Sequence, residues 1–289
     1  MHALDPHAKS LMGKLDFSRR GFVTAGLSGG FALAVLPVAA ETIHTDASGL
    51  EVADVEVPVK DGKIPAYRAM PAKGGPFPTV LVIQEVFGVH EHIKDLCRRF
   101  AKLGYFAVAP YLYSRLGDVT KLSDLKEVLA FANRASEPQV MSDLDATVAW
   151  ARKTKKADVR RMAATGFCRG GRYTWLYAEH NPQLKAAVAW YGPLNVAKSE
   201  LTPVSPPDQI ALLKVPVLGL YGAADQGIPV ADVEKFRDAL KANHKKSEFV
   251  IYPDTPHGFN ADYRPSYRPE AALDGWKRML AWFKKYGAA

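Results

Sequence analysis

Short apolar runs alternate with amphipathic stretches along most of this chain. Alternating valines before the turn signal Asp61-Gly62 predict a β-hairpin over residues 52–70. Continuous apolar runs, of the kind found in buried parallel strands, follow at residues 79–83, 105–109, 162–165, 186–191, 215–221 and 249–252. Segments with a helical period lie between them, at residues 92–103, 138–153 and 173–178. Strands that alternate with helices predict a mostly parallel sheet covered by helices on both faces.

Two further helices are expected near the C-terminus. Pro229 suits the start of a helix, and the apolar face that follows it consists of Val230, Val233, Phe236 and Leu240. A closing helix presents Leu273, Trp276, Leu280 and Phe283 on one face. Residues 110–136 and 193–213 show no sustained period, so we expect both segments to be loops.

Composition places the chain among ordinary globular proteins. Its 289 residues, 48% of them hydrophobic and 24% charged, are enough for one sizeable core, and no internal repeat divides them. The formal net charge of +8 is spread along the chain. Because no basic run is interleaved with aromatic residues, we expect no nucleic-acid partner and only a mild attraction for anionic substrates.

The first forty residues differ from the rest. Arg19 and Arg20, with Phe22 two places on, precede a weakly apolar segment at residues 24–40. This order resembles a twin-arginine export signal, and Val38-Ala39-Ala40 offers small residues for cleavage. A single membrane anchor is the alternative, although the segment is short and weakly apolar for a spanning helix. We therefore expect a signal peptide at residues 1–40, one domain at residues 41–289, a periplasmic location and no stable membrane insertion after cleavage.

The segment Gly166-Phe167-Cys168-Arg169-Gly170 lies between an apolar run and a helical one. Strand, sharp turn and helix are the context of a nucleophile elbow, whose strained turn requires small residues two places before and after the nucleophile. The start of the helix carries partial positive charge, which favours the thiolate form of Cys168. A buried, inert cysteine beside a glycine-rich turn is the alternative interpretation.

Two further candidate groups follow predicted strands. Asp225 comes after one strand and His257 after the last, and the order nucleophile, acid, histidine is that of α/β-hydrolases. In such a triad Cys168 attacks an acyl carbon, His257 transfers protons, and Asp225 fixes the imidazole tautomer. Asp254 and Asp262, on the loop of His257 itself, are rival acids. We favour Asp225, because Asp254 lies too near in sequence to reach the far nitrogen of the ring easily.

Two backbone amides are candidates for an oxyanion hole, and the second cysteine is expected to have no catalytic role. An oxyanion hole would use the amide of Arg169 and that of Val86, in the loop after residues 79–83. Cys97 lies within a predicted helix and is expected to be a small core residue, since two cysteines do not make a disulfide framework.

Five short segments form a joint pattern that is more specific than any single motif. They are Gln84-Glu85-Val86-Phe87-Gly88, Pro110-Tyr111-Leu112-Tyr113-Ser114-Arg115, the elbow with Gly171, Trp190-Tyr191-Gly192 and His257-Gly258-Phe259. In this combination the chain resembles the dienelactone hydrolase family from about residue 50 to the end. The resemblance implies a compact α/β-hydrolase fold without a large lid domain, no cofactor, and the triad Cys168, Asp225 and His257. It also implies hydrolysis of dienelactone (4-carboxymethylenebut-2-en-4-olide) to maleylacetate.

The same resemblance implies roles for residues outside the triad. In that family a glutamate matching Glu85 contacts the nucleophile's thiol until substrate displaces it; an exposed loop carboxylate is the alternative interpretation here. Arg115 matches an arginine that pairs with the lactone's carboxylate, and Tyr191 is implied to bind substrate. The family's second carboxylate-binding arginine corresponds to Ala261, which puts dienelactone itself in question. Arg264 and Arg268 are nearby basic residues that could replace it.

Three functional classes remain open at this point. They are a cysteine-nucleophile hydrolase of carboxylic esters or lactones, a related acyl hydrolase of other esters, thioesters or amides, and a non-catalytic binding protein on the same scaffold. We favour the first, acting as a monomer on a small ester or lactone. No metal is expected, because His90-Glu91-His92 is a thin ligand pattern that suits a solvated loop.

Overall fold

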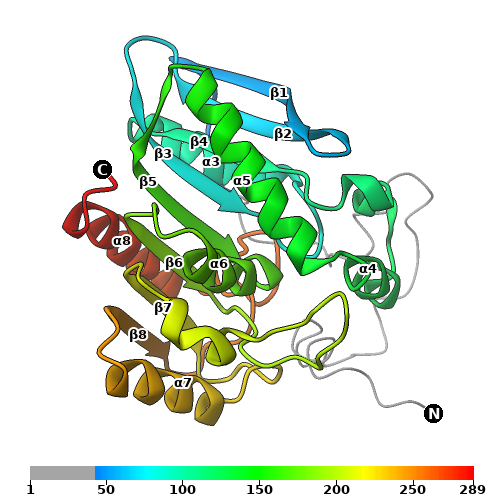
Figure 1. Ribbon diagram of the computed structural model, residues 1–289, viewed down its shortest axis with the longest axis vertical. Helices are drawn as coiled ribbons and strands as arrows, with labels where there is room; N and C mark the ends of the chain where they lie inside the picture. The colour runs from blue at the N-terminus through cyan, green and yellow to red at the C-terminus, as the bar shows by residue number, and fades with distance from the viewer. Residues whose placement is uncertain (1–42) are drawn as a thin grey trace, which may run out of the picture.

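Eight strands form one sheet in the computed structural model, which describes residues 43–289 (Figure 1). The strands are β1 (Leu50–Val59), β2 (Gly62–Pro71), β3 (Phe77–Ile83), β4 (Phe106–Pro110), β5 (Ala157–Phe167), β6 (Ala186–Trp190), β7 (Val217–Gly222) and β8 (Ser247–Tyr252). Their order across the sheet is β1-β2-β4-β3-β5-β6-β7-β8. The signal peptide expected at residues 1–40 lies outside the described residues.

The sheet is antiparallel at one edge and parallel elsewhere. Strand β1 pairs antiparallel with β2, with Val57 opposite Ile64, and β2 pairs antiparallel with β4. The pairs β4–β3, β3–β5, β5–β6, β6–β7 and β7–β8 are parallel. The predicted hairpin and the predicted mostly parallel sheet are therefore confirmed.

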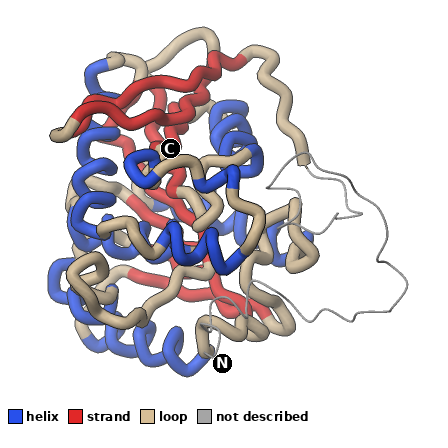
Figure 2. Tube along the Cα trace, turned by 90° about the vertical axis from the view of Figure 1, so that its right-hand side faces the viewer, coloured by secondary structure: helices blue, strands red, loops and turns tan. Residues whose placement is uncertain are grey.

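Helices cover both faces of the sheet. They are α3 (Glu91–Lys102), α4 (Leu125–Ala132), α5 (Glu137–Lys153), α6 (Arg169–His180), α7 (Val230–Ala242) and α8 (Pro269–Lys285). Helix α5 packs on α6, and α6 packs on β5 and β6. On the other face Phe100 of α3 contacts Trp276 and Phe283 of α8, with ring centroids 4.8 and 6.2 Å away. Figure 2 shows the strands between these layers, which is the expected α/β-hydrolase fold without a large lid domain.

None of the helices in residues 43–289 combines the length and the apolar composition that crossing a bilayer requires.

Helix α6, which follows Cys168, is deeply buried. Its residues Tyr173, Trp175 and Tyr177 are each 0% exposed. The indole N–H of Trp175 donates to the Tyr221 hydroxyl (3.0 Å), and its ring packs edge-on against Phe236. Because close packing holds α6 in place, it also fixes the position of the residue that precedes its first turn.

Two segments that we expected to be loops contain short helices. Residues 110–136 hold the 3₁₀ turns η1 (Ser114–Leu116) and η2 (Val119–Lys121) as well as α4, and residues 193–213 hold η3 (Pro206–Leu212). Asp124 caps the start of α4, since its side chain accepts hydrogen bonds from the backbone N–H groups of Lys126 (2.9 Å) and Glu127 (3.1 Å). Such a cap stabilises a helix that is too short to show a clear period.

The face of the closing helix α8 that packs on the core differs in part from the face that we expected. Leu273 is 57% exposed, whereas Met279 and Phe283 are buried. Gly275 faces the sheet instead, and a Cβ atom there would lie 2.6 Å from the ring of Trp190. The absence of a side chain at Gly275 lets α8 approach the sheet closely, and this rotation carries Leu273 outward.

Candidate active site

Cys168 occupies a sharp turn between β5 and α6. Its φ of 55° and ψ of −121° lie where few residues other than glycine are found. A Cβ on Gly166 would come within 2.5 Å of the Gly170 carbonyl carbon, and a Cβ on Gly170 within 2.5 Å of the Gln84 carbonyl oxygen. Both glycines thus have the steric role that the sequence suggested, and the turn has the geometry of a nucleophile elbow.

The elbow lies directly against the loop that follows β3. Contact between Gly170 and the carbonyls of Ile83 and Gln84 fixes this approach. Val86 lies two residues further along that loop and is buried, while Arg169 is the first residue of α6. The two segments expected to supply oxyanion-hole amides therefore meet beside Cys168.

Asp225 and His257 lie together in the loops after β7 and β8. Asp225 Oδ2 is 2.7 Å from His257 Nδ1. Asp225 Oδ1 accepts hydrogen bonds from the backbone N–H groups of Gly227 (2.8 Å) and Ile228 (3.1 Å). Since one oxygen is held by the loop, the other is directed at the imidazole, and the ring is fixed with its second nitrogen on the opposite side.

Charge couples His257 to Cys168. Burial lowers the pKa of His257, but the negative charges of Asp225 and Cys168, and hydrogen bonds to both, raise it overall to about 10. The His257 residue is 1% exposed and Cys168 4%, so water screens this interaction little. A protonated imidazole at this place stabilises a thiolate.

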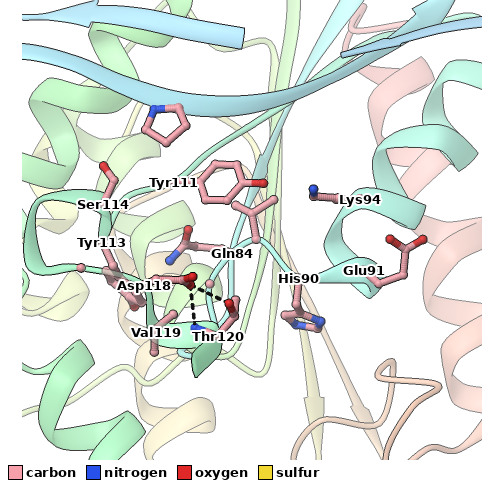
Figure 3. A pocket seen from close by; sticks show the side chains of 14 residues that line it. Gln84, His90, Glu91, Lys94, Tyr111, Tyr113, Ser114, Asp118, Val119 and Thr120 are labelled. Atoms are coloured by element: carbon pink, nitrogen blue, oxygen red, sulfur yellow. Dashed lines mark hydrogen bonds between the residues drawn. The ribbon is translucent and has the colours of Figure 1, made fainter. Parts of the chain in front are cut away.

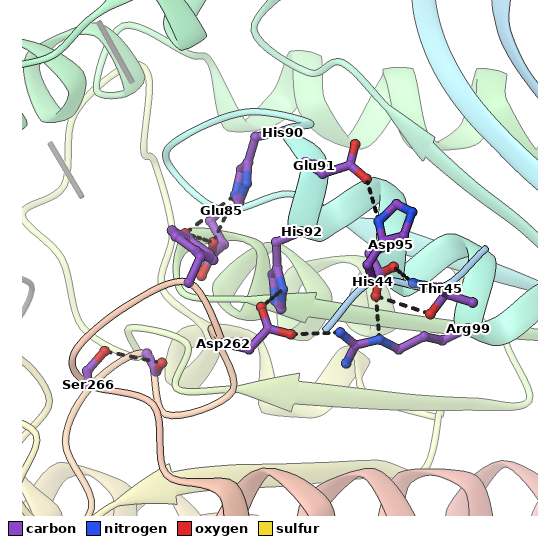
Figure 4. A network of polar contacts seen from close by, with 12 residues as sticks. His44, Thr45, Glu85, His90, Glu91, His92, Asp95, Arg99, Asp262 and Ser266 are labelled. Atoms are coloured by element: carbon purple, nitrogen blue, oxygen red, sulfur yellow. Dashed lines mark hydrogen bonds and ion pairs between the residues drawn. The ribbon is translucent and has the colours of Figure 1, made fainter. Parts of the chain in front are cut away.

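The rival acids have other surroundings. Asp254 is exposed. Asp262 is buried, lies 3.0 Å from Nδ1 of His92 and pairs with Arg99 (2.7 Å) (Figure 4). Neither of these carboxylates is a hydrogen-bond partner of His257 in residues 43–289, so the contact belongs to Asp225 alone among the three candidates.

Cys97 lies in α3 and is 0% exposed. Burial raises the pKa of its thiol well above the usual range, so it behaves as the small core residue that the sequence suggested. Cys97 and Cys168 are both free thiols.

The Glu85 carboxylate is buried and bound by two neighbours. Its Oε2 accepts a hydrogen bond from the Tyr263 hydroxyl (2.6 Å) and lies 3.2 Å from Nε2 of His90. Within residues 43–289 none of its side-chain hydrogen bonds goes to Cys168. Burial raises the pKa of Glu85, but the hydrogen bonds and positive charge around it lower the pKa overall. In this conformation Glu85 is an ionised carboxylate beside the site, neither exposed nor in contact with the thiol.

His90 and His92 contradict our expectation of a solvated loop. They are only 7% and 4% exposed, and they lie against Glu85 and Asp262 (Figure 4). Burial also lowers the pKa of His90. The two imidazoles belong to a buried polar network that extends from the loop after β3 to the loop after β8.

The Arg115 guanidinium is engaged by two carboxylates of the protein, contrary to the role that the family resemblance implied. It donates to both carboxylate oxygens of Asp61, each at 2.6 Å, and to both oxygens of Asp143, at 2.6 and 3.0 Å. Two bidentate carboxylates occupy its donors. Arg115 therefore connects the β1–β2 turn to α5, and it is not among the residues that line the neighbouring cavity.

A cavity of about 690 Å³ opens beside the loop after β3 (Figure 3). Gln84 and His90 form one side of it, and Tyr111 and Tyr113 from the segment after β4 form another. Tyr191, the other residue implied to bind substrate, is 0% exposed and packs edge-on against His257 with centroids 5.0 Å apart. A small organic substrate could enter through this cavity.

Some residues around the site had no clear signal in the sequence. Tyr263 binds Glu85 although the two are far apart along the chain. Tyr113 and Tyr173 are buried near Cys168. Burial raises the pKa of Tyr113 most, and the charges of Tyr173 and then of Cys168 raise it further. Tyr113 was part of a recognised segment, but no spacing rule distinguished it from its neighbours.

The model of the dienelactone hydrolase family matches residues 64–287. The chain belongs to this family. A protein of Methylorubrum extorquens named "Putative carboxymethylenebutenolidase" is 58% identical over 291 residues, which cover 100% of both chains. A protein of the same name from Escherichia coli K12 is 49% identical over 89% of this chain and 96% of its own length. The crystal structure of the "Putative Dienelactone Hydrolase" from Klebsiella pneumoniae has a TM-score of 0.80 and 50% identity, and it covers 82% of this chain and 99% of that one. This member of the family is thus a dienelactone hydrolase-like hydrolase.

Proposed function

We propose that this dienelactone hydrolase family member cleaves a small carboxylic ester or lactone through Cys168, His257 and Asp225. The observation that carries the proposal is the strained elbow at Cys168 beside the His257–Asp225 pair, whose nitrogen and oxygen are 2.7 Å apart. Nucleophile, base and orienting acid are the three parts that acyl transfer by this route requires.

The reaction has two steps. In the first, the Cys168 thiolate attacks the acyl carbon, and the amides of Val86 and Arg169 receive the developing oxyanion. The acyl C–O bond then breaks, and protonated His257 gives its proton to the leaving alkoxide. In the second step His257 takes a proton from water, the hydroxide attacks the thioester, and the thiolate leaves with the acid as product.

The family relation and the names of the relatives favour a lactone such as dienelactone. The engaged Arg115 and the apolar Ala261 argue against the family's usual way of holding its carboxylate. Hydrolysis of other esters, thioesters or amides by the same triad is the second candidate, because those departures leave the triad unchanged.

We also propose that the protein is exported with a twin-arginine signal and acts in the periplasm. Arg19, Arg20 and the weakly apolar residues 24–40 support this location. Cell fractionation tests it, with Arg19→Lys/Arg20→Lys as the comparison, and an unchanged periplasmic amount in that variant would contradict it.

The central test compares kcat/KM of residues 41–289 on dienelactone and on 4-nitrophenyl acetate. Cys168→Ala should abolish both activities while circular dichroism and the unfolding midpoint stay close to wild type. Cys97→Ala is the matched control, since it removes the other thiol from the core, and it should retain activity. Turnover by the purified Cys168→Ala protein would refute the mechanism.

A further inference from the structure

The positions that the family resemblance assigns to a substrate carboxylate are not available to one here. Two carboxylates already engage Arg115. Ala261 is apolar and buried. Arg264 is also buried, and its guanidinium lies over the ring of Phe87, 5.2 Å from the centroid. An anionic substrate would therefore need a different cation near the nucleophile.

Arg169 is a cation with no ion pair in residues 43–289. Its guanidinium donates a hydrogen bond to the side-chain oxygen of Asn133, which is neutral. Burial lowers the pKa of Arg169, but attraction to Tyr173, Tyr113 and Cys168 raises it overall. A guanidinium next to the nucleophile therefore keeps its full charge without a neighbouring carboxylate to balance it.

The Arg169 side chain lines a second cavity, of about 650 Å³. Its polar, uncharged lining residues are Asn133, Asn195, Ser199 and Thr202, and within residues 43–289 no Asp or Glu lines it. Two more cations of the wall face carboxylates, in the pairs Arg172–Glu137 (2.6 Å) and Lys198–Asp208 (2.9 Å). Among the three cations of this wall in residues 43–289, Arg169 is therefore the one whose positive charge is not balanced by an ion pair.

Two buried hydroxyls lie close enough to Arg169 to interact electrostatically with its guanidinium, yet neither meets hydrogen-bond geometry with a partner in residues 43–289. They belong to Tyr113, which is 2% exposed, and Tyr173, which is 0% exposed. Tyr113 lines the first cavity (Figure 3), whereas Arg169 lines the second. Buried hydroxyls without a partner cost free energy that a bound acceptor recovers, and a carboxylate offers acceptors only.

We propose that Arg169, with the hydroxyls of Tyr113 and Tyr173, forms an anion subsite that holds a carboxylate of the substrate beside Cys168. The inference rests on the proposed hydrolase function and narrows its substrates to esters or lactones that carry a negative charge. The Arg169 residue then serves twice: its backbone N–H faces the oxyanion, and its side chain holds the carboxylate.

Paired substrates that differ by one charge test the subsite. We would measure kcat/KM on 4-nitrophenyl hydrogen succinate and on its neutral methyl ester. Arg169→Gln should lower the ratio of anionic to neutral kcat/KM by about 10- to 100-fold, the range for a lost hydrogen bond to a charged group, and Arg169→Lys should restore part of it. Arg115→Gln, the control cation, should leave the ratio unchanged. An unchanged ratio in Arg169→Gln, or a fall confined to Arg115→Gln or Arg264→Gln, would overturn the proposal.

A binding measurement separates this inference from the proposed function. Calorimetry on the Cys168→Ala protein measures the affinity for 4-nitrophenyl hydrogen succinate without turnover, and adding Arg169→Gln should weaken it by the same factor. Arg169-dependent binding with no hydrolysis by wild type would keep the subsite and reject the hydrolase. Hydrolysis of both esters with no dependence on Arg169 in either experiment would keep the hydrolase and reject the subsite.

Discussion

Replacing Asp225 by asparagine tests the charge arrangement of the site directly. In the structure Oδ1 of Asp225 is held by the N–H groups of Gly227 and Ile228, which leaves Oδ2 facing Nδ1 of His257 at 2.7 Å. An asparagine oxygen would keep the two backbone hydrogen bonds, since only an acceptor can satisfy them. Its NH₂ group would then face His257, and the ring would have to accept at Nδ1 and carry its proton on Nε2.

That tautomer changes the chemistry on the other side of the ring. A neutral imidazole with hydrogen on Nε2 has no lone pair to take the thiol proton of Cys168. Without the carboxylate, the pKa of His257 also loses the strongest influence that opposes burial, so the imidazolium that stabilises the thiolate is lost. We expect kcat to fall by about 10⁴-fold, the scale of the same substitution in a serine-protease triad.

The assay is kcat on 4-nitrophenyl acetate at neutral pH, combined with the rate of Cys168 alkylation by iodoacetamide. Both should fall in Asp225→Asn, because both depend on the thiolate. Asp254→Asn is the matched control: it makes the same chemical change on an exposed carboxylate near His257, and asparagine tolerates its φ of 49°. Activity of Asp225→Asn within about threefold of the control would refute the proposed role of the pair.

Three further outcomes are expected. Gly166→Ala brings a methyl group within 2.5 Å of the Gly170 carbonyl carbon, so urea unfolding should show a loss of at least about 2 kcal/mol, and a near-neutral result would contradict the packing argument. Tyr263→Phe removes the 2.6 Å hydrogen bond to Glu85 and should cost about 1.5–3 kcal/mol in the same experiment; an unchanged midpoint would mean that water replaces it. In the wild-type protein burial lowers the pKa of His257, but Asp225 and Cys168 raise it overall from about 6.5 in the unfolded chain to about 10. The stabilisation from His257 is complete below pH 6.5 and is lost as the pH rises toward 10, by up to about 1.4 kcal/mol per pH unit, and Asp225→Asn should reduce this slope; an equally steep slope in Asp225→Asn would contradict the role of the pair.

The framework of the site was predictable because it follows from periodicity and strand order. Parallel strands place their carboxyl ends at one edge, so residues that come directly after β5, β7 and β8 must meet there. Cys168, Asp225 and His257 each occupy such a position, and the structure brings them together. The glycines of the elbow were equally readable, since a strained turn admits few other residues.

The surroundings of the site were not predictable in this way, because they depend on partners that are distant in sequence. Arg115 aligned with a substrate-binding residue, yet Asp61 and Asp143 engage it from the hairpin turn and from α5. The contact between Glu85 and Tyr263 likewise joins the loop after β3 to the loop after β8, far apart along the chain. The partners of such side chains depend on how the fold brings distant segments together, so a local sequence pattern does not predict them.

The position of His257 in the loop after the last strand has a consequence for synthesis. A ribosome completes the elbow and its neighbours β3, β5 and β6 before β7 and β8 exist. During that interval Cys168 lacks both of its proposed partners, Asp225 and His257. In the proposed mechanism hydrolysis can begin only once β8 joins the edge of the sheet, so a chain truncated before His257 would carry Cys168 without the groups proposed to activate it.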